Sequence, residues 1–153
     1  MKNIGMCLAL IVVPANAHAG ARQTAMVMLS DDTQLRKVEE QLGFADAVVS
    51  GDTIYLSGVV AGLRPGETDL SLAYTRAFRR IEAILKRADA SWDDVIDITS
   101  FHTDLGAQMP AIVAVKNKFV HAPPPAWTAI QVVRLIPDNG ITEIKIVARR
   151  KQH

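Results

Sequence analysis

Residues 46–60 of this 153-residue chain read DAVVSGDTIYLSGVV and predict two strands joined by a tight turn. Both halves are rich in β-branched and aromatic residues, and the Ser50-Gly51-Asp52 turn between them is typical of a β-hairpin. The run from Leu35 to Val38 predicts a further strand before it. We therefore expect the folded domain to begin near residue 35 with antiparallel strands.

Two helices are expected after this hairpin. In residues 68–88, apolar side chains recur at three- and four-residue spacing, and Thr68 or Asp69 can cap the first turn. Pro110 suits the first turn of a second helix that runs to about Val120, before three consecutive prolines at 123–125. The charged residues of the first helix are expected to form a solvated face.

Three further strands are predicted at residues 95–103, 127–135 and 141–149, and Asn139-Gly140 indicates a tight hairpin turn between the last two. This order predicts an α+β fold, a mixed six-stranded sheet with two helices on one face. The strand at 127–135 is apolar on both faces, with Ile130 and Val132 on one side and Ala129 and Val133 on the other. Unless a long loop covers it, we expect the open face of the sheet to pack against another subunit.

The first nineteen residues differ from the rest of the chain. Lys2, a ten-residue apolar run and the small residues Ala17-His18-Ala19 follow the order of a secretory signal peptide, cleaved after Ala19. The alternatives are a disordered start or a membrane-anchoring helix. We expect a secreted or periplasmic protein with a flexible lead at 20–34, a domain at 35–153 and no membrane contact after cleavage. Cleavage would also remove Cys7, the single cysteine.

Composition and spacing give few other site motifs. The net charge is +1 with both signs interspersed, which argues against a nucleic-acid partner. His102 lies in an expected strand without the spacing of a metal site, so a hydrogen-bonded strand histidine is the simpler interpretation. Ser57 lacks the sequence context of a nucleophile elbow.

Several ordered segments nevertheless resemble one family. They are Gly51–Gly58, Ile81–Ala88, Asp94-Val95, Pro125-Ala126, residues 132–135, Glu143-Ile144 and residues 148–150. Each is weak alone, but their order and spacing resemble the RidA/YjgF family over residues 44–149. The resemblance implies a chorismate-mutase-like homotrimer with ligand clefts between subunits. It also implies hydrolysis of reactive imines and enamines to 2-oxo acids and ammonia, without a metal or organic cofactor.

The resemblance also implies site residues. Glu143 matches the glutamate associated with water, and Ser57 and Gly58 match a serine–glycine pair, so Glu143 and Ser57 are the expected catalytic residues. Trp127 stands where the family has an arginine that pairs with the substrate carboxylate. An indole has one N–H donor and no charge, so it cannot form that bidentate pair.

The other expected ligand-binding positions have also become apolar. Phe44 stands where a tyrosine is usual, Val113 where an asparagine is usual, and Ala129 where a cysteine is frequent. Two functions follow. One is an imine or enamine hydrolase with a changed substrate, and the other is a non-catalytic homotrimer that binds a small apolar or aromatic molecule.

Overall fold

The computed structural model describes residues 20–150, so the expected leader at 1–19 lies outside the described residues. Its strands are β1 (Met26–Met28), β2 (Ala47–Ser50), β3 (Thr53–Leu56), β4 (Val59–Gly62), β5 (Val95–His102), β6 (Ala126–Gln131) and β7 (Gly140–Arg149). Its helices are α1 (Ala21–Thr24), α2 (Thr33–Leu42), α3 (Leu70–Arg87) and α4 (Leu105–Lys116), with a 3₁₀ turn η1 (Trp92–Asp94).

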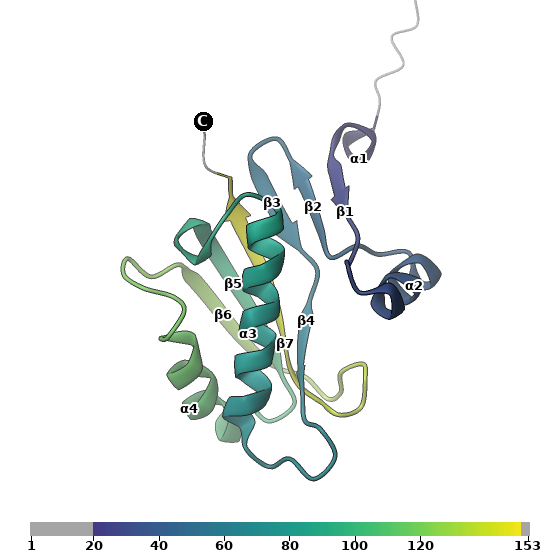
Figure 1. Cartoon of the computed structure of the whole chain (residues 1–153). Coiled ribbons are helices and arrows are strands. Elements are labelled where there is room, and N and C mark those ends of the chain that lie inside the picture. Colours follow the sequence, from purple (N-terminus) through teal and green to yellow (C-terminus); the bar gives the residue numbers. More distant parts are fainter. Residues whose placement is uncertain (1–19, 151–153) are drawn as a thin grey trace, which may run out of the picture.

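The strands form one mixed sheet in the order β1-β2-β3-β7-β5-β6, and β4 also pairs with β7. Helices α3 and α4 lie on one face, while α2 stands beside the β1–β2 end (Figure 1). The α+β architecture is confirmed. The sheet has seven strands rather than six, because β1 joins its edge and the run 53–60 divides at Ser57-Gly58, while the strand expected at Leu35–Val38 is helical.

The hairpin of residues 46–60 is confirmed in register. Ser50 pairs with Thr53, so Gly51 and Asp52 form the turn. Gly51 has φ 61°, and a positive φ at the first central residue is a requirement of the type II′ turn that glycine meets without strain.

The expected strand at Leu35–Val38 is wrong, because this run lies inside α2. The Asp32 carboxylate accepts hydrogen bonds from the backbone N–H groups of Gln34 and Leu35, at 2.8 and 3.1 Å. These bonds satisfy donors that the first helical turn leaves free. The expected flexible lead at 20–34 contains α1, β1 and the start of α2.

Two other boundaries differ from the sequence prediction. Helix α4 begins at Leu105, capped by Asp104, so Pro110 lies inside the helix rather than in its first turn, and the helix ends at Lys116. The strand that begins near Trp127 ends at Gln131, which leaves Val132 and Val133 outside it. Side-chain capping by Asp104 and the parallel pairing of β6 with β5 set these limits.

The predicted hairpin between the last two strands is also wrong. β6 pairs in parallel with β5, and β7 pairs antiparallel with β5, so β5 separates them. A parallel pair needs a crossover connection, and α4 supplies it between β5 and β6. The turn around Asn139-Gly140 instead returns the chain to the centre of the sheet.

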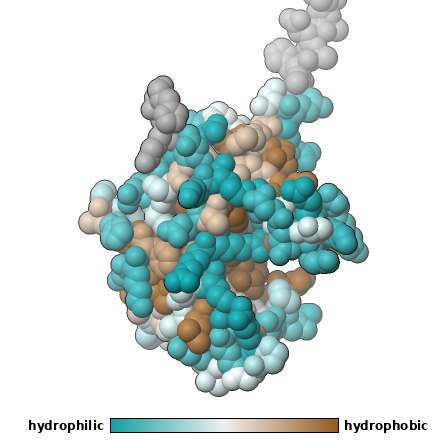
Figure 2. Space-filling view, viewed as in Figure 1, coloured by the Kyte–Doolittle hydropathy of each residue, from teal (hydrophilic) through white to brown (hydrophobic). Residues whose placement is uncertain are grey.

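The core lies between the sheet and α3, whose N-terminal cap is Asp69, as the sequence predicts. Phe78, Ile81 and Leu85 of α3 are buried against Ile144 and Ile146 of β7 and their neighbours in one apolar cluster. The solvent side of α3 is largely hydrophilic (Figure 2). No described helix is long and apolar enough to cross a membrane.

We predict that Leu85→Ala lowers the free energy of unfolding by about 2–5 kcal/mol, because it opens a cavity at a fully buried helix position. Leu42→Ala is the matched control, since Leu42 is also helical but 66% exposed, and should cost below about 1 kcal/mol. Urea unfolding at one protein concentration measures both. Equal losses would contradict the described core.

Candidate functional site

Glu143 and Gly58 are in direct contact. Glu143 lies in β7 between buried Thr142 and Ile144, so its side chain points to the sheet face opposite the helices. A Cβ placed on Gly58 would lie 1.7 Å from Oε1 and 2.5 Å from Cδ of Glu143. Only glycine leaves room for the carboxyl group there, which explains why glycine occupies position 58 next to Glu143.

Ser57 holds the backbone beside this contact. Its hydroxyl donates to the Ala45 carbonyl at 2.6 Å, and its backbone N–H donates to the Asp46 carbonyl at 2.9 Å. These bonds tie the β3–β4 junction to the segment before β2. The hydroxyl proton of Ser57 is therefore engaged, and in this geometry the side chain orders the Gly58 backbone rather than acting as a free nucleophile.

Trp127 lies on the other face of the sheet. It pairs in register with buried Ile98, so its half-buried indole faces the helices, away from Glu143. The indole N–H donates to Ser100 Oγ at 2.9 Å, and Lys116 Nζ lies 5.3 Å from the ring centroid. The single N–H donor of the indole is thus directed into the protein, and the Lys116 ammonium group lies over the ring.

The Trp127 N–H ends a buried polar network. Ser100 Oγ lies 2.9 Å from His102 Nε2, and His102 Nδ1 faces Thr142 Oγ1 at 3.1 Å and Gln108 Oε1 at 3.3 Å. Tyr74 OH lies 2.8 Å from Thr142 Oγ1. Both ring nitrogens of His102 therefore have hydrogen-bonding partners, and which nitrogen carries the proton depends on the tautomer.

Burial lowers the pKa of His102, against a smaller opposing effect of its hydrogen bond with Gln108. The prediction of a hydrogen-bonded strand histidine is confirmed. The sequence prediction missed the partners Ser100 and Gln108. Ile98, Ser100 and His102 occupy successive inward positions of β5. Polar residues at inward strand positions are the signal that could have revealed the network.

The remaining expected ligand-binding residues are divided between two ends of the sheet. Ala129 pairs with Ser100 on the helix face of β6, and Val113 lies on α4 one turn before Lys116. Phe44 follows α2 near β2, with 38% of its surface exposed. Four strand spacings of about 4.8 Å separate β2 from β6, so roughly 19 Å of sheet lies between these groups.

A single chain therefore assembles only part of the expected site. Glu143, Gly58 and Ser57 meet at the β3–β4 junction, whereas Trp127, Ala129 and Val113 lie at the β6–α4 edge and Phe44 at the opposite edge. Within residues 20–150, no group of three histidine, cysteine, aspartate or glutamate residues is placed to hold a metal ion.

The fold and the Glu143–Gly58 contact define a class of α+β proteins with a mixed sheet covered by two helices. The profile of the family described as endoribonuclease L-PSP matches residues 36–150. The RutC family protein YjgH of Escherichia coli K12 is 40% identical over 109 residues, which cover 69% of this chain and 82% of that protein. The chain belongs to the RidA/YjgF family.

Solved structures agree with this assignment. A structure described as protein YJGH superposes with a TM-score of 0.69 at 35% identity, covering 83% of this chain and 96% of that one. RidA from the Antarctic bacterium Psychrobacter sp. PAMC 21119 gives a TM-score of 0.62 at 26% identity, covering 80% and 93%.

We predict that Gly58→Ala destabilises the protein chiefly through its clash with Glu143. The cost should shrink by about 0.5–3 kcal/mol when Gly58→Ala is introduced into Glu143→Ala, because the atoms nearest the new Cβ are side-chain atoms of Glu143. Urea unfolding of both single variants and the double variant measures this coupling. Additive losses would mean that the two residues do not touch.

Proposed function

We propose that this protein is an exported imine or enamine hydrolase with a changed substrate, acting at a site completed by a second copy of the chain. The contact between Glu143 and Gly58 carries this proposal. It places a carboxyl group against exposed backbone on an uncovered sheet face, where a small molecule and water can reach it.

The chemistry needs one acid–base group. Glu143 takes a proton from water as the water oxygen bonds to the carbon of the C=N group, and the proton then passes to nitrogen. Glu143 then moves the hydroxyl proton of the adduct to nitrogen as the C–N bond breaks, which gives a carbonyl compound and ammonia. General acid–base catalysis of this kind typically contributes about 10²–10⁴-fold.

A second copy explains the division of the remaining residues. Phe44 and Trp127 lie at opposite ends of the sheet, so one pocket can contain both only if two chains supply them. The open sheet face also exposes Tyr55 by 48% and Ile130 by 44%, an apolar surface of the kind that subunits cover. Homotrimer formation, which the family resemblance implies, would satisfy both observations.

Trp127 favours a changed substrate. Its N–H is donated to Ser100, so the ring offers an apolar face rather than a hydrogen bond to a ligand. A flat or apolar ligand suits such a surface better than a small imino acid. Export by the leader at 1–19 also favours a substrate other than the imines of cytoplasmic pyridoxal-phosphate enzymes. RNA cleavage, which the family description names, is less favoured because both charge signs are interspersed along the chain.

A non-catalytic binding protein is the second candidate. The engaged hydroxyl of Ser57 favours it, because that side chain has no free proton to offer a substrate. In that case the apolar residues Phe44, Val113 and Ala129 would line a ligand site, and Glu143 would only accept hydrogen bonds.

We predict that an imine with a flat or apolar group is hydrolysed faster than 2-iminopropionate, and that this rate falls about 10²–10⁴-fold in Glu143→Gln. Ammonia release measures the rate. Glu82→Gln is the matched control, because Glu82 is exposed on α3 away from the site and should leave the rate unchanged. Activity that appears only in Trp127→Arg would favour the binding protein, with a lost carboxylate anchor.

We predict that the purified chain is a trimer in size-exclusion chromatography with light scattering. Ile130→Lys places a charge on the open face of β6 and should shift the mass toward the monomer. Glu82→Lys is a charge-changing control at an exposed position of α3, on the other side of the sheet. A monomeric native protein would contradict the proposal that two chains share the site.

A further inference from the structure

A second group of charged residues lies between α2 and α3. Glu39 of α2 is fully buried. Its Oε2 accepts the backbone N–H of Ser30 at 2.7 Å, while Oε1 has no hydrogen-bond donor among the described residues. A buried carboxylate oxygen without a donor is costly, so this oxygen requires an explanation.

Asp46 supplies a partner. Its carboxyl group is 4% exposed, and its negative charge raises the pKa of the neighbouring Glu39. Arg80 of α3 binds Asp46 Oδ1 at 2.8 Å, and Arg87 of α3 binds Oδ2 at 3.1 Å. Asp46 is therefore held on α3 by two guanidinium groups, and Glu39 approaches the same carboxylate from α2.

Two adjacent buried carboxyl groups share a proton more readily than they carry two charges. Burial raises the pKa of Glu39, the Ser30 N–H opposes this, Asp46 raises it further, and the positive charge of Arg80 lowers it. A protonated Glu39 can donate from Oε1 to Asp46. This bond accounts for the oxygen that otherwise has no donor.

The pair is connected to the candidate site through the backbone. The carbonyl of Asp46 accepts the N–H of Ser57, and the carbonyl of Ala45 accepts its hydroxyl. Gly58 follows Ser57 in the chain and is in contact with the Glu143 carboxyl group. Phe44 lies in the same short segment between α2 and β2.

We propose that Glu39 and Asp46 are positioning residues. A proton shared between them holds α2 and residues 44–46 against α3. This contact in turn keeps Ser57 and Gly58 next to the Glu143 carboxyl group. Other polar and charged groups surround the pair. Arg87 also binds Asp31 and the Leu29 carbonyl, and Arg36 donates to the Ser30 carbonyl. The inference concerns the geometry of the β3–β4 junction and does not depend on which reaction occurs there.

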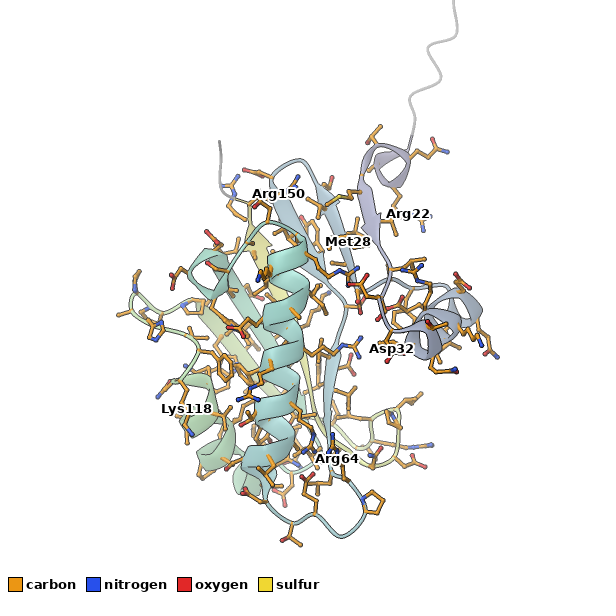
Figure 3. The ribbon with its side chains drawn as sticks, viewed as in Figure 1. Arg22, Met28, Asp32, Arg64, Lys118 and Arg150 are labelled. Carbon is orange, nitrogen blue, oxygen red and sulfur yellow. The ribbon has the colours of Figure 1, made fainter. Side chains whose placement is uncertain are left out.

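Asp46 also borders open space between the two helices. A cleft of about 620 Å³ lies between α2 and α3, and its lining includes Asp46, Arg80, Arg87, Leu35 and Val38. Asp32, labelled in Figure 3, caps the N-terminus of α2 at this cleft.

The sign of the pH effect follows from the raised pKa. Below the ordinary pKa of 4.5, Glu39 is protonated in the folded and unfolded chains, and the shared proton contributes fully. As the pH rises from 4.5 toward the pKa of Glu39 in the folded protein, Glu39 ionises first in the unfolded chain. The shared proton then contributes less to the stability of the folded state. The folding equilibrium falls by about tenfold for each pH unit in this window.

The test compares Glu39→Gln with the full native chain. Glutamine keeps the shape, accepts the Ser30 N–H and donates to Asp46 at every pH. Urea unfolding from pH 4 to 9 should show that the native decline caused by Glu39 is absent in this variant. Glu40→Gln is the matched control, because Glu40 is the adjacent, exposed residue of α2 and should keep the native profile.

Two NMR measurements test positioning itself. The Glu39 carboxyl ¹³C resonance of the native chain should titrate above 4.5, and the amide resonances of Ser57 and Gly58 should move with the same midpoint. Those amide shifts should disappear in Glu39→Gln. A native Glu39 midpoint at or below 4.5 would overturn the proposal even if the variant failed to fold. The proposal would also be overturned if the Ser57 and Gly58 amide resonances did not shift as Glu39 titrates.

Discussion

The pairing of β7 with three other strands is the constraint on which the rest of the structure depends. Its residues 147–149 pair with β3, residues 140–144 pair with β4, and β5 runs along its other side. β3 and β4 must therefore meet opposite the middle of β7, and the chain breaks its strand at Ser57-Gly58. Because Glu143 lies beside that break, the same pairing that builds the sheet also brings the carboxyl group against glycine.

The two faces of the sheet have separate polar arrangements. On the helix face, the indole of Trp127 ends a network through Ser100 and His102, which the surrounding core keeps out of water. On the open face, the Glu143 carboxyl group stays partly accessible. Each arrangement is fixed by neighbours from other elements, and the Ser57 bonds to residues 45 and 46 connect the open face to α2 and α3.

The sequence predicted some elements better than others for identifiable reasons. The hairpin at 46–60 and the helix α3 have strong local signals, a Gly-Asp turn and a regular apolar spacing, and both are confirmed. The run Leu35–Val38 places two basic residues between two apolar ones, too short a pattern to define an element, and it lies in a helix that Asp32 caps. The Asn139-Gly140 signal was misleading because the insertion of β5 between β6 and β7 is a non-local event.

The sequence by itself determined the α+β class, the hairpin turn at Gly51-Asp52 and the family, since these depend on short patterns and their order. Only the tertiary structure decided that Glu143 touches Gly58, that Trp127 faces the opposite side of the sheet, and that Glu39 lies buried beside Asp46. The physical reason is register. Side chains alternate between the two faces of a strand, so a residue's partners depend on how strands distant in sequence align, and local patterns do not carry that information.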